Sequence, residues 1–523
     1  MMINLSVVRK LQLAFSNLIN GYSLPLTCAE IVLPEVRKMD VLKIDYENGL
    51  LLKNVNVVDV ITGKILDGRS VEIRDGMINS ITEVNCPPHN VKSMIDLQCS
   101  YLLPGLIDAH CHSTFPSTYN FEITQLFSYF AQIRRNYLHL IKNGITTIRD
   151  MGAFPLLLDF FIKKIDAGSI LGPRIQHCYT FTNVHRGHPD INPMDLTRWA
   201  LFDPITIGNQ SIWFNNNQEL IEGLEKNLKK NASFIKLTLD DISILCGGGK
   251  LPTYNDDNLK TILRYAKIYH LPLAGHTLSK FGFDRALQYG INSIEHSISD
   301  AFLSDEDVTA MASKRIANVP TLLVGMIYAA EEAFDYIPDE YQNHFIDELR
   351  ALRRNFIYSP QNNYILKGID NANKKMLKYY KKYNQADLFK KKMFLTHPDI
   401  FFGVLKHAPV NLHKMKEAGI LIGCGTDGGM PYIPNGCLWL EMSLLSKIGF
   451  SNAEILRCAT LNNAKILHMS DKIGSIDKGK LADLVVVREN PLQKLETCRR
   501  PAMVIKDGRI QCIDSEMRPF SIS

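Results

Sequence analysis

The chain has 523 residues, of which 46% are hydrophobic and 22% are charged, a balance typical of a globular protein with a large core. The formal net charge is only +5, from 59 basic and 54 acidic residues, so charge gives no argument for nucleic-acid binding. The 11 cysteines are odd in number and include no CxxC pair, which favours reduced thiols in a cytoplasmic protein over a secreted disulfide framework.

The N-terminal segment, residues 1–44, is predicted to be a helical extension that packs on the body of the protein. Its beginning has two basic residues, Arg9 and Lys10, but polar side chains interrupt the apolar stretch that a secretory signal needs. A targeting role for this segment stays open. No apolar run approaches the roughly 20 residues that cross a bilayer, so no membrane span is expected.

Short alternating apolar runs separated by turns occur near both ends of the chain. Asp75-Gly76 separates two such runs, and Asp507-Gly508 has the same place near the C-terminus; this dipeptide is a hairpin signal. Segments from opposite ends can pair while the middle folds separately. We therefore expect residues 45–103 and 470–515 to form one small β-sandwich domain.

The middle of the chain, residues 104–469, alternates apolar strand-like runs with helical stretches. This alternation predicts a parallel sheet, and eight repeats predict its closure into an α/β fold of the (β/α)8 barrel type. A helical insertion is expected at about 325–412, after the seventh strand. The eight predicted strands are Leu103–His110, Ile145–Arg149, Arg174–Tyr179, Phe234–Thr238, Pro272–His276, Ser293–His296, Ile316–Thr321 and Ile420–Gly425.

Candidate metal ligands lie where these strands end. His110 and His112 are two residues apart in one strand, so both imidazoles can face one cation. A barrel also brings together residues that end other strands, and Zn²⁺ accepts mixed nitrogen and oxygen ligands. A lysine inside a strand is costly to bury unless it is paired or modified. These further candidates are His276, His296, Asp427 and Lys236.

Several of these motifs together resemble the amidohydrolase superfamily, and its prolidase-like and imidazolonepropionase-related branch in particular. The resemblance begins with LPGLIDAHCH at Leu103–His112 and continues, in the family order, over about residues 50–510. The other motifs that carry it are Gly144–Asp150, Phe234–Lys236, Ser293–His296, Gly425–Asp427 and Gly474–Asp483.

The resemblance implies a role for each candidate. His110, His112 and Asp427 would hold a buried divalent cation, and His276 and His296 an outer one, and the expected metal is zinc. Lys236, carboxylated by CO2, would bridge the pair. A metal-bridging hydroxide would then attack an amide or peptide-like C–N bond, and Asp427 would carry its proton to the leaving amine. His188 corresponds to a histidine that contacts the substrate carbonyl in prolidase-like relatives.

Alternatives remain at this point. An unmodified Lys236 would leave a mononuclear cyclic amidase or deaminase, and a third possibility is a non-catalytic barrel scaffold. A dipeptide or N-acyl amino acid is the expected substrate, and a homo-oligomer is possible. Arg149 and Asp150 are expected to be structural ties. Arg186 and Tyr254 are expected in exposed loops, with a substrate carboxylate as their alternative partner.

Overall fold

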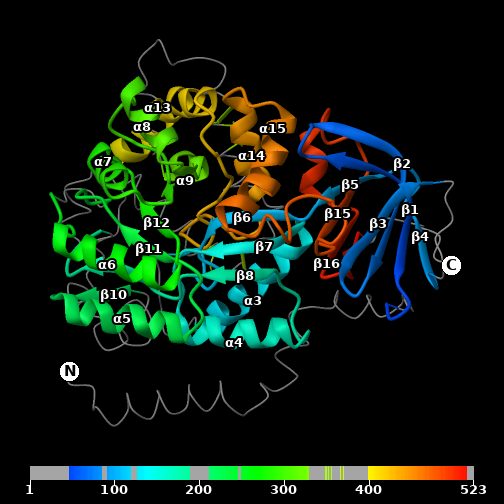
Figure 1. Cartoon of the computed structure of the whole chain (residues 1–523), viewed down its shortest axis with the longest axis horizontal. Coiled ribbons are helices and arrows are strands. Elements are labelled where there is room, and N and C mark those ends of the chain that lie inside the picture. The colour runs from blue at the N-terminus through cyan, green and yellow to red at the C-terminus, as the bar shows by residue number, and fades with distance from the viewer. Residues whose placement is uncertain are drawn as a thin grey trace, which may run out of the picture.

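The computed structural model describes residues 46–84, 91–118, 126–188, 211–244, 249–328 and 398–514, with a few positions between 348 and 371. A β-rich part made from both chain ends lies beside a larger α/β part (Figure 1). The predicted N-terminal extension and most of the predicted insertion lie outside the described residues, and the proposed domain boundaries stay predictions. No described helix is both long and apolar enough to cross a membrane.

The β-rich part is one eight-stranded sheet with strands from both ends of the chain. Its order is β17-β16-β15-β5-β1-β2-β3, and β4 pairs with β1. Here β5 joins the two ends, since it runs parallel to β1 and antiparallel to β15. Because these strands form a single sheet, the expected two-sheet sandwich is not confirmed. The strands are β1 (Leu50–Asp59), β2 (Lys64–Arg74), β3 (Met77–Glu83), β4 (Ser93–Asp96), β5 (Tyr101–Pro104), β15 (Leu484–Val487), β16 (Met503–Lys506) and β17 (Arg509–Ile513).

The α/β part contains two parallel sheets, β6-β7-β8 and β10-β9-β11-β12-β13-β14. Every residue of β6, β7 and β11 is buried, as expected for parallel strands covered on both faces. The strands are β6 (Leu106–Cys111), β7 (Ile145–Asp150), β8 (Arg174–His177), β9 (Phe181–Val184), β10 (Ser211–Phe214), β11 (Ile235–Thr238), β12 (Leu273–His276), β13 (Ser293–Glu295) and β14 (Ala317–Val319).

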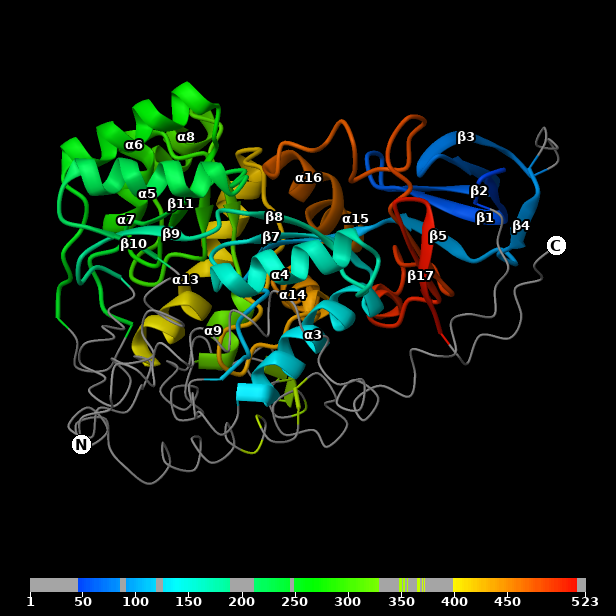
Figure 2. The ribbon, with the colours of Figure 1, turned by 90° about the horizontal axis from the view of Figure 1, so that it is seen from below.

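Helices follow most of these strands and lie outside the sheets (Figure 2). Their ends carry the expected signals: Ser304 and Asp307 form a capping box at the start of α8, and Gly290 ends α7 with φ of 65°. The helices are α3 (Leu126–Lys142), α4 (Pro155–Asp166), α5 (Asn217–Lys229), α6 (Asp256–Tyr269), α7 (Lys280–Tyr289), α8 (Asp305–Ser313), α9 (Leu322–Tyr328), α13 (Pro398–Glu417), α14 (Leu438–Lys447), α15 (Asn452–Arg457) and α16 (Asn463–Ile466).

The predicted eighth strand, Ile420–Gly425, is not a regular strand. One isolated parallel bridge joins its Ile422 to Asn318, and a second joins Gly428, beyond its end, to Cys111. A few backbone hydrogen bonds join it to its neighbours, such as Gly423 N to the carbonyl oxygen of Asn318, and a side chain, Asn463, accepts from the backbone N–H of Cys424. The described strands therefore form a barrel-like arrangement that is not closed by a continuous ladder.

A partly buried ion-pair cluster joins the two parts of the chain. Arg174 of β8 donates to Thr147 Oγ1 of β7 at 3.0 Å and pairs with Asp483 and Asp507, which flank strands of the β-rich part. We expect Arg174→Ala to lower the free energy of unfolding by about 1–3 kcal/mol, because partly buried acceptors lose their donors. Urea unfolding measures this change.

Arg488→Ala is the matched control, since Arg488 also pairs with an aspartate, Asp514, at 3.1 Å, but on an exposed surface. Exposed pairs contribute roughly 0–1 kcal/mol. If the two variants were equally stable, the cluster would not join the two parts energetically.

Candidate metal centre

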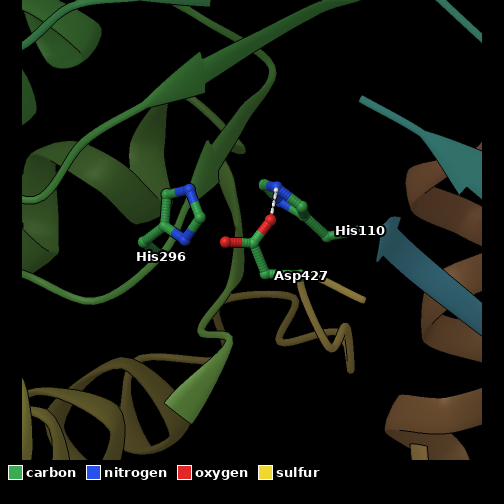
Figure 3. A group of neighbouring side chains, drawn as sticks. All are labelled: His110, His296 and Asp427. Carbon is green, nitrogen blue, oxygen red and sulfur yellow. Dashed lines mark ion pairs between the residues drawn. The ribbon is translucent and has the colours of Figure 1, made fainter. Parts of the chain in front are cut away.

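The end of β6 and the loop after residue 425 bring three predicted ligands together. Asp427 Oδ1 lies 3.4 Å from His110 Nε2 and 3.2 Å from His112 Nε2, and it has no hydrogen-bond partner of good geometry. His296 also lies at this place, and Figure 3 shows its ring beside the Asp427 carboxylate and facing His110. Asp427 has φ of 57°, a left-handed conformation that Asp tolerates better than most residues.

The imidazole rings form a continuous row across the strand ends. The ring centroids of His110 and His296 are 4.6 Å apart, those of His296 and His276 are 4.3 Å apart, and those of His276 and His188 are 4.2 Å apart. Burial, with a smaller effect from neighbouring imidazoles, lowers the pKa of His276 and of His296 well below the ordinary value. Both rings are therefore neutral near pH 7, which is the form that binds metal ions.

Lys236 lies on β11 with its ammonium group inside the same cluster. The residue is 4% exposed, and its Nζ has no hydrogen-bond partner. Burial lowers the pKa of Lys236 to about 8, although the carboxylates of Glu295 and Asp427 oppose that shift. An appreciable part of the amine is thus neutral near pH 7, and a neutral amine is the form that reacts with CO2.

Three of the histidines are oriented through Nδ1. His110 Nδ1 lies 2.9 Å from Glu295 Oε2, and His296 Nδ1 lies 2.7 Å from Thr321 Oγ1. His112 Nδ1 lies 2.7 Å from the carbonyl oxygen of Gly152. Partners of this kind fix the ring and leave Nε2 for a ligand. These partners could not be chosen from the motifs, because they come from other strand ends.

A buried ion pair supports the orienting carboxylate. Arg149 donates to Glu295 Oε1 at 2.6 Å, to Ser293 Oγ at 3.1 Å and to the carbonyl oxygen of Ala109 at 2.7 Å. Burial alone would raise the pKa of Glu295, but Arg149 and His110 outweigh it and hold that pKa well below its usual range. Arg149 lies on β7 and ties three strands together, in agreement with the structural role expected for it.

A second group lies beside the first and includes a residue that the sequence did not single out. One ligand atom each of His188, Asp240 and His276 lies within 4.8 Å of the others. Asp240 follows β11, four positions after Lys236, and its place just beyond a strand end is the only sequence signal that could have identified it.

The expectation that Tyr254 lies in an exposed loop is wrong. Tyr254 is 1% exposed and donates to the carbonyl oxygen of Thr182, so it is a core residue.

All six predicted ligands and His188 thus belong to one buried cluster. These residues fit divalent cations, because imidazole nitrogens and a carboxylate oxygen approach one another at 3.2 and 3.4 Å, while the buried Asp427 Oδ1 makes no hydrogen bond. What the geometry establishes is a set of nitrogen and oxygen donors converging on one place.

Comparison with known proteins agrees with this arrangement. The model of the amidohydrolase family matches residues 101–511, and the chain belongs to this family of hydrolases. Members of the family generally use divalent metal ions. The resemblance inferred from the motifs is therefore confirmed.

The identity to individual relatives is low, but the similarity extends over most of each chain. Ochratoxinase from Aspergillus niger is 22% identical over 464 residues, which cover 84% of this chain and 82% of that protein. Imidazolonepropionase from Fusobacterium nucleatum is 21% identical over 501 residues, or 87% of this chain and 88% of that protein. A crystal structure of a Xaa-Pro dipeptidase with bound methionine has a TM-score of 0.66 at 22% identity, and covers 88% of this chain and 99% of that one. This likeness supports a TIM-barrel-like fold.

Proposed function

We propose that this chain hydrolyses an amide or peptide-like C–N bond, of a dipeptide or an N-acyl amino acid, at a pair of divalent cations, zinc by preference. The observation that carries the proposal is the buried cluster at the strand ends, in which four imidazoles and the carboxylate of Asp427 lie together with the buried, unpaired Nζ of Lys236. The relatives support the reaction class, because ochratoxinase, imidazolonepropionase and a Xaa-Pro dipeptidase are among them.

The ligand assignment is the one that the family motifs imply. His110, His112 and Asp427 would hold the inner cation, and His276 and His296 the outer one. When bound, the cation pair would supply a hydroxide nucleophile at neutral pH and polarise the scissile carbonyl. His188 lies against His276, so it would contact the substrate carbonyl at the outer side of the cluster.

Asp427 would transfer the proton from the nucleophile to the leaving amine. Burial by itself would raise its pKa, but His110 and His112 outweigh this effect and hold the pKa well below its usual range. The group is therefore a carboxylate near pH 7, able to accept a proton and to donate it to the leaving nitrogen. That transfer leaves a neutral amine product and a free carboxyl product.

Lys236 would be the bridging ligand after carboxylation. Its neutral amine attacks CO2, an N–C bond forms, and one proton is released, so that the side chain becomes an anionic carbamate. The low pKa of Lys236 and the lack of a hydrogen bond to its Nζ support this modification. An anionic oxygen donor would also remove the cost of a buried, unpaired ammonium group.

Metal analysis beside a hydrolysis screen tests the proposal. We expect two equivalents of divalent cation per purified chain, together with release of amino acids from dipeptides or N-acyl amino acids. One equivalent with ammonia release from a cyclic or amino-substituted substrate would instead favour a mononuclear deaminase. A chain that binds no metal and turns over no substrate would be a scaffold, and the proposal would be wrong.

A further inference from the structure

Asp240 is an aspartate whose position none of the family motifs explains. It lies after β11 and beside the start of α7, and its side chain is fully buried. Leu278 N and Ser279 N donate to its carboxylate at 2.7 and 2.9 Å, and Ser279 Oγ donates at 2.6 Å. The carboxylate is thus held rigidly, with Oδ2 toward His276.

The distance between Asp240 and His276 is informative. Asp240 Oδ2 lies 3.5 Å from His276 Nε2, and that nitrogen is buried without a hydrogen-bond partner. A good N–H···O bond measures about 2.7–3.2 Å. Two ligands bound at about 2.1 Å to one tetrahedral cation lie about 3.4 Å apart. In the inner group, Asp427 Oδ1 lies at a comparable 3.4 Å from His110 Nε2, and at 3.2 Å from His112 Nε2.

The charge of the Asp240 carboxylate also indicates a metal ligand. Among the described residues, no lysine or arginine forms an ion pair with Asp240, whose one potential partner of that kind is His276. Buried carboxylates are costly unless a positive charge compensates them. Glu295 is equally buried but has Arg149 beside it at 2.6 Å. Asp240 has three hydrogen-bond donors and no such cation, which is the environment of a metal-binding carboxylate.

We propose that Asp240 is an additional ligand of the outer cation, which it binds through Oδ2 beside His276 Nε2. This inference rests on the proposed two-cation function and extends it. Asp240 would give the outer cation a resident carboxylate, as Asp427 would give the inner one. His188 stands within the same group and keeps its proposed contact with the substrate carbonyl.

Cobalt titration of the metal-free protein tests the assignment without any need for turnover. We expect the wild-type chain to bind two equivalents of Co²⁺. Asp240→Asn is expected to bind the first equivalent as the wild type does and the second at least about 10-fold more weakly, because an amide is a poorer and uncharged ligand. Equal affinity of both proteins for the second equivalent would overturn the inference.

Asp300→Asn is the matched control. Asp300 also accepts a backbone N–H at the start of α7, from Lys280 at 2.7 Å, but it is exposed and is not a member of the ligand group. Both equivalents should bind to this variant with wild-type affinity. Thermal unfolding of the metal-free proteins shows whether either variant loses stability because the start of α7 has lost a hydrogen-bond acceptor. A wild-type chain that binds a single cation would instead overturn the two-cation function.

Asp240→Cys provides an independent signature. A thiolate bound to Co²⁺ gives a sulfur-to-metal charge-transfer band in the near ultraviolet. We expect this band to appear in Asp240→Cys with the second equivalent and to be absent from the wild type, whose described cysteines near the cluster, Cys111 and Cys178, do not belong to the ligand groups. No band after both equivalents are bound would mean that residue 240 does not touch the cation.

Discussion

Asp427→Asn is expected to lower kcat/KM by about 10³-fold while the chain remains folded. General acid–base catalysis contributes roughly 10²–10⁴-fold, and the variant cannot carry a proton between nucleophile and leaving amine. Asparagine retains the size of aspartate and tolerates the left-handed φ of 57° at this position. The loss would therefore reflect chemistry and not a strained backbone.

Steady-state kinetics and metal content should be measured together for Asp427→Asn. Weaker binding of the inner cation is expected as well, because an anionic ligand is replaced by a neutral one. Asp305→Asn is a suitable control, since Asp305 pairs with Lys414 on the surface and belongs to neither ligand group. Wild-type kcat/KM in Asp427→Asn would exclude the proposed proton transfer.

Loss of the Arg149 side chain is expected to have the largest effect on stability. Arg149→Met should lower the free energy of unfolding by about 3–5 kcal/mol, because it leaves the carboxylate of Glu295 buried without its counter-charge. Arg149 and Glu295 are 4% and 0% exposed. His110 should lose its fixed orientation too, since Glu295 holds its Nδ1.

The double variant Arg149→Met with Glu295→Gln separates charge from packing. It should recover part of the stability lost in the single variant, because no unpaired charge stays buried. Chemical unfolding of the wild type, both single variants and the double variant gives the coupling energy. Strictly additive effects would mean that the ion pair does not act as a unit.

Much of the fold was predictable from the sequence for a simple reason. Buried parallel strands appear as continuous apolar runs, and Gly290 marks the helix end before one of them. The ligands were predictable because residues at parallel strand ends meet at one edge, so that His276 and His296 could be assigned to a common place without knowledge of the loops.

Other features depend on contacts between residues far apart in the chain. In the predicted eighth strand, the side chain of Asn463, 39 positions further along the chain, accepts the backbone N–H of Cys424, and no pattern within the strand indicates this contact. Glu295 orients His110 across 185 positions of sequence. Asp240 looked like an ordinary loop residue, and only its burial against His276 and the start of α7 separates it from its neighbour Asp241.

Anomalous diffraction at the zinc absorption edge, on crystals grown with zinc, tests the central claim most directly. The account predicts two anomalous peaks, one contacted by His110 and Asp427 and one by His276, with extra density that extends Lys236 between them. A single peak, or zinc bound away from these side chains, would contradict the two-cation arrangement on which the proposed hydrolysis depends.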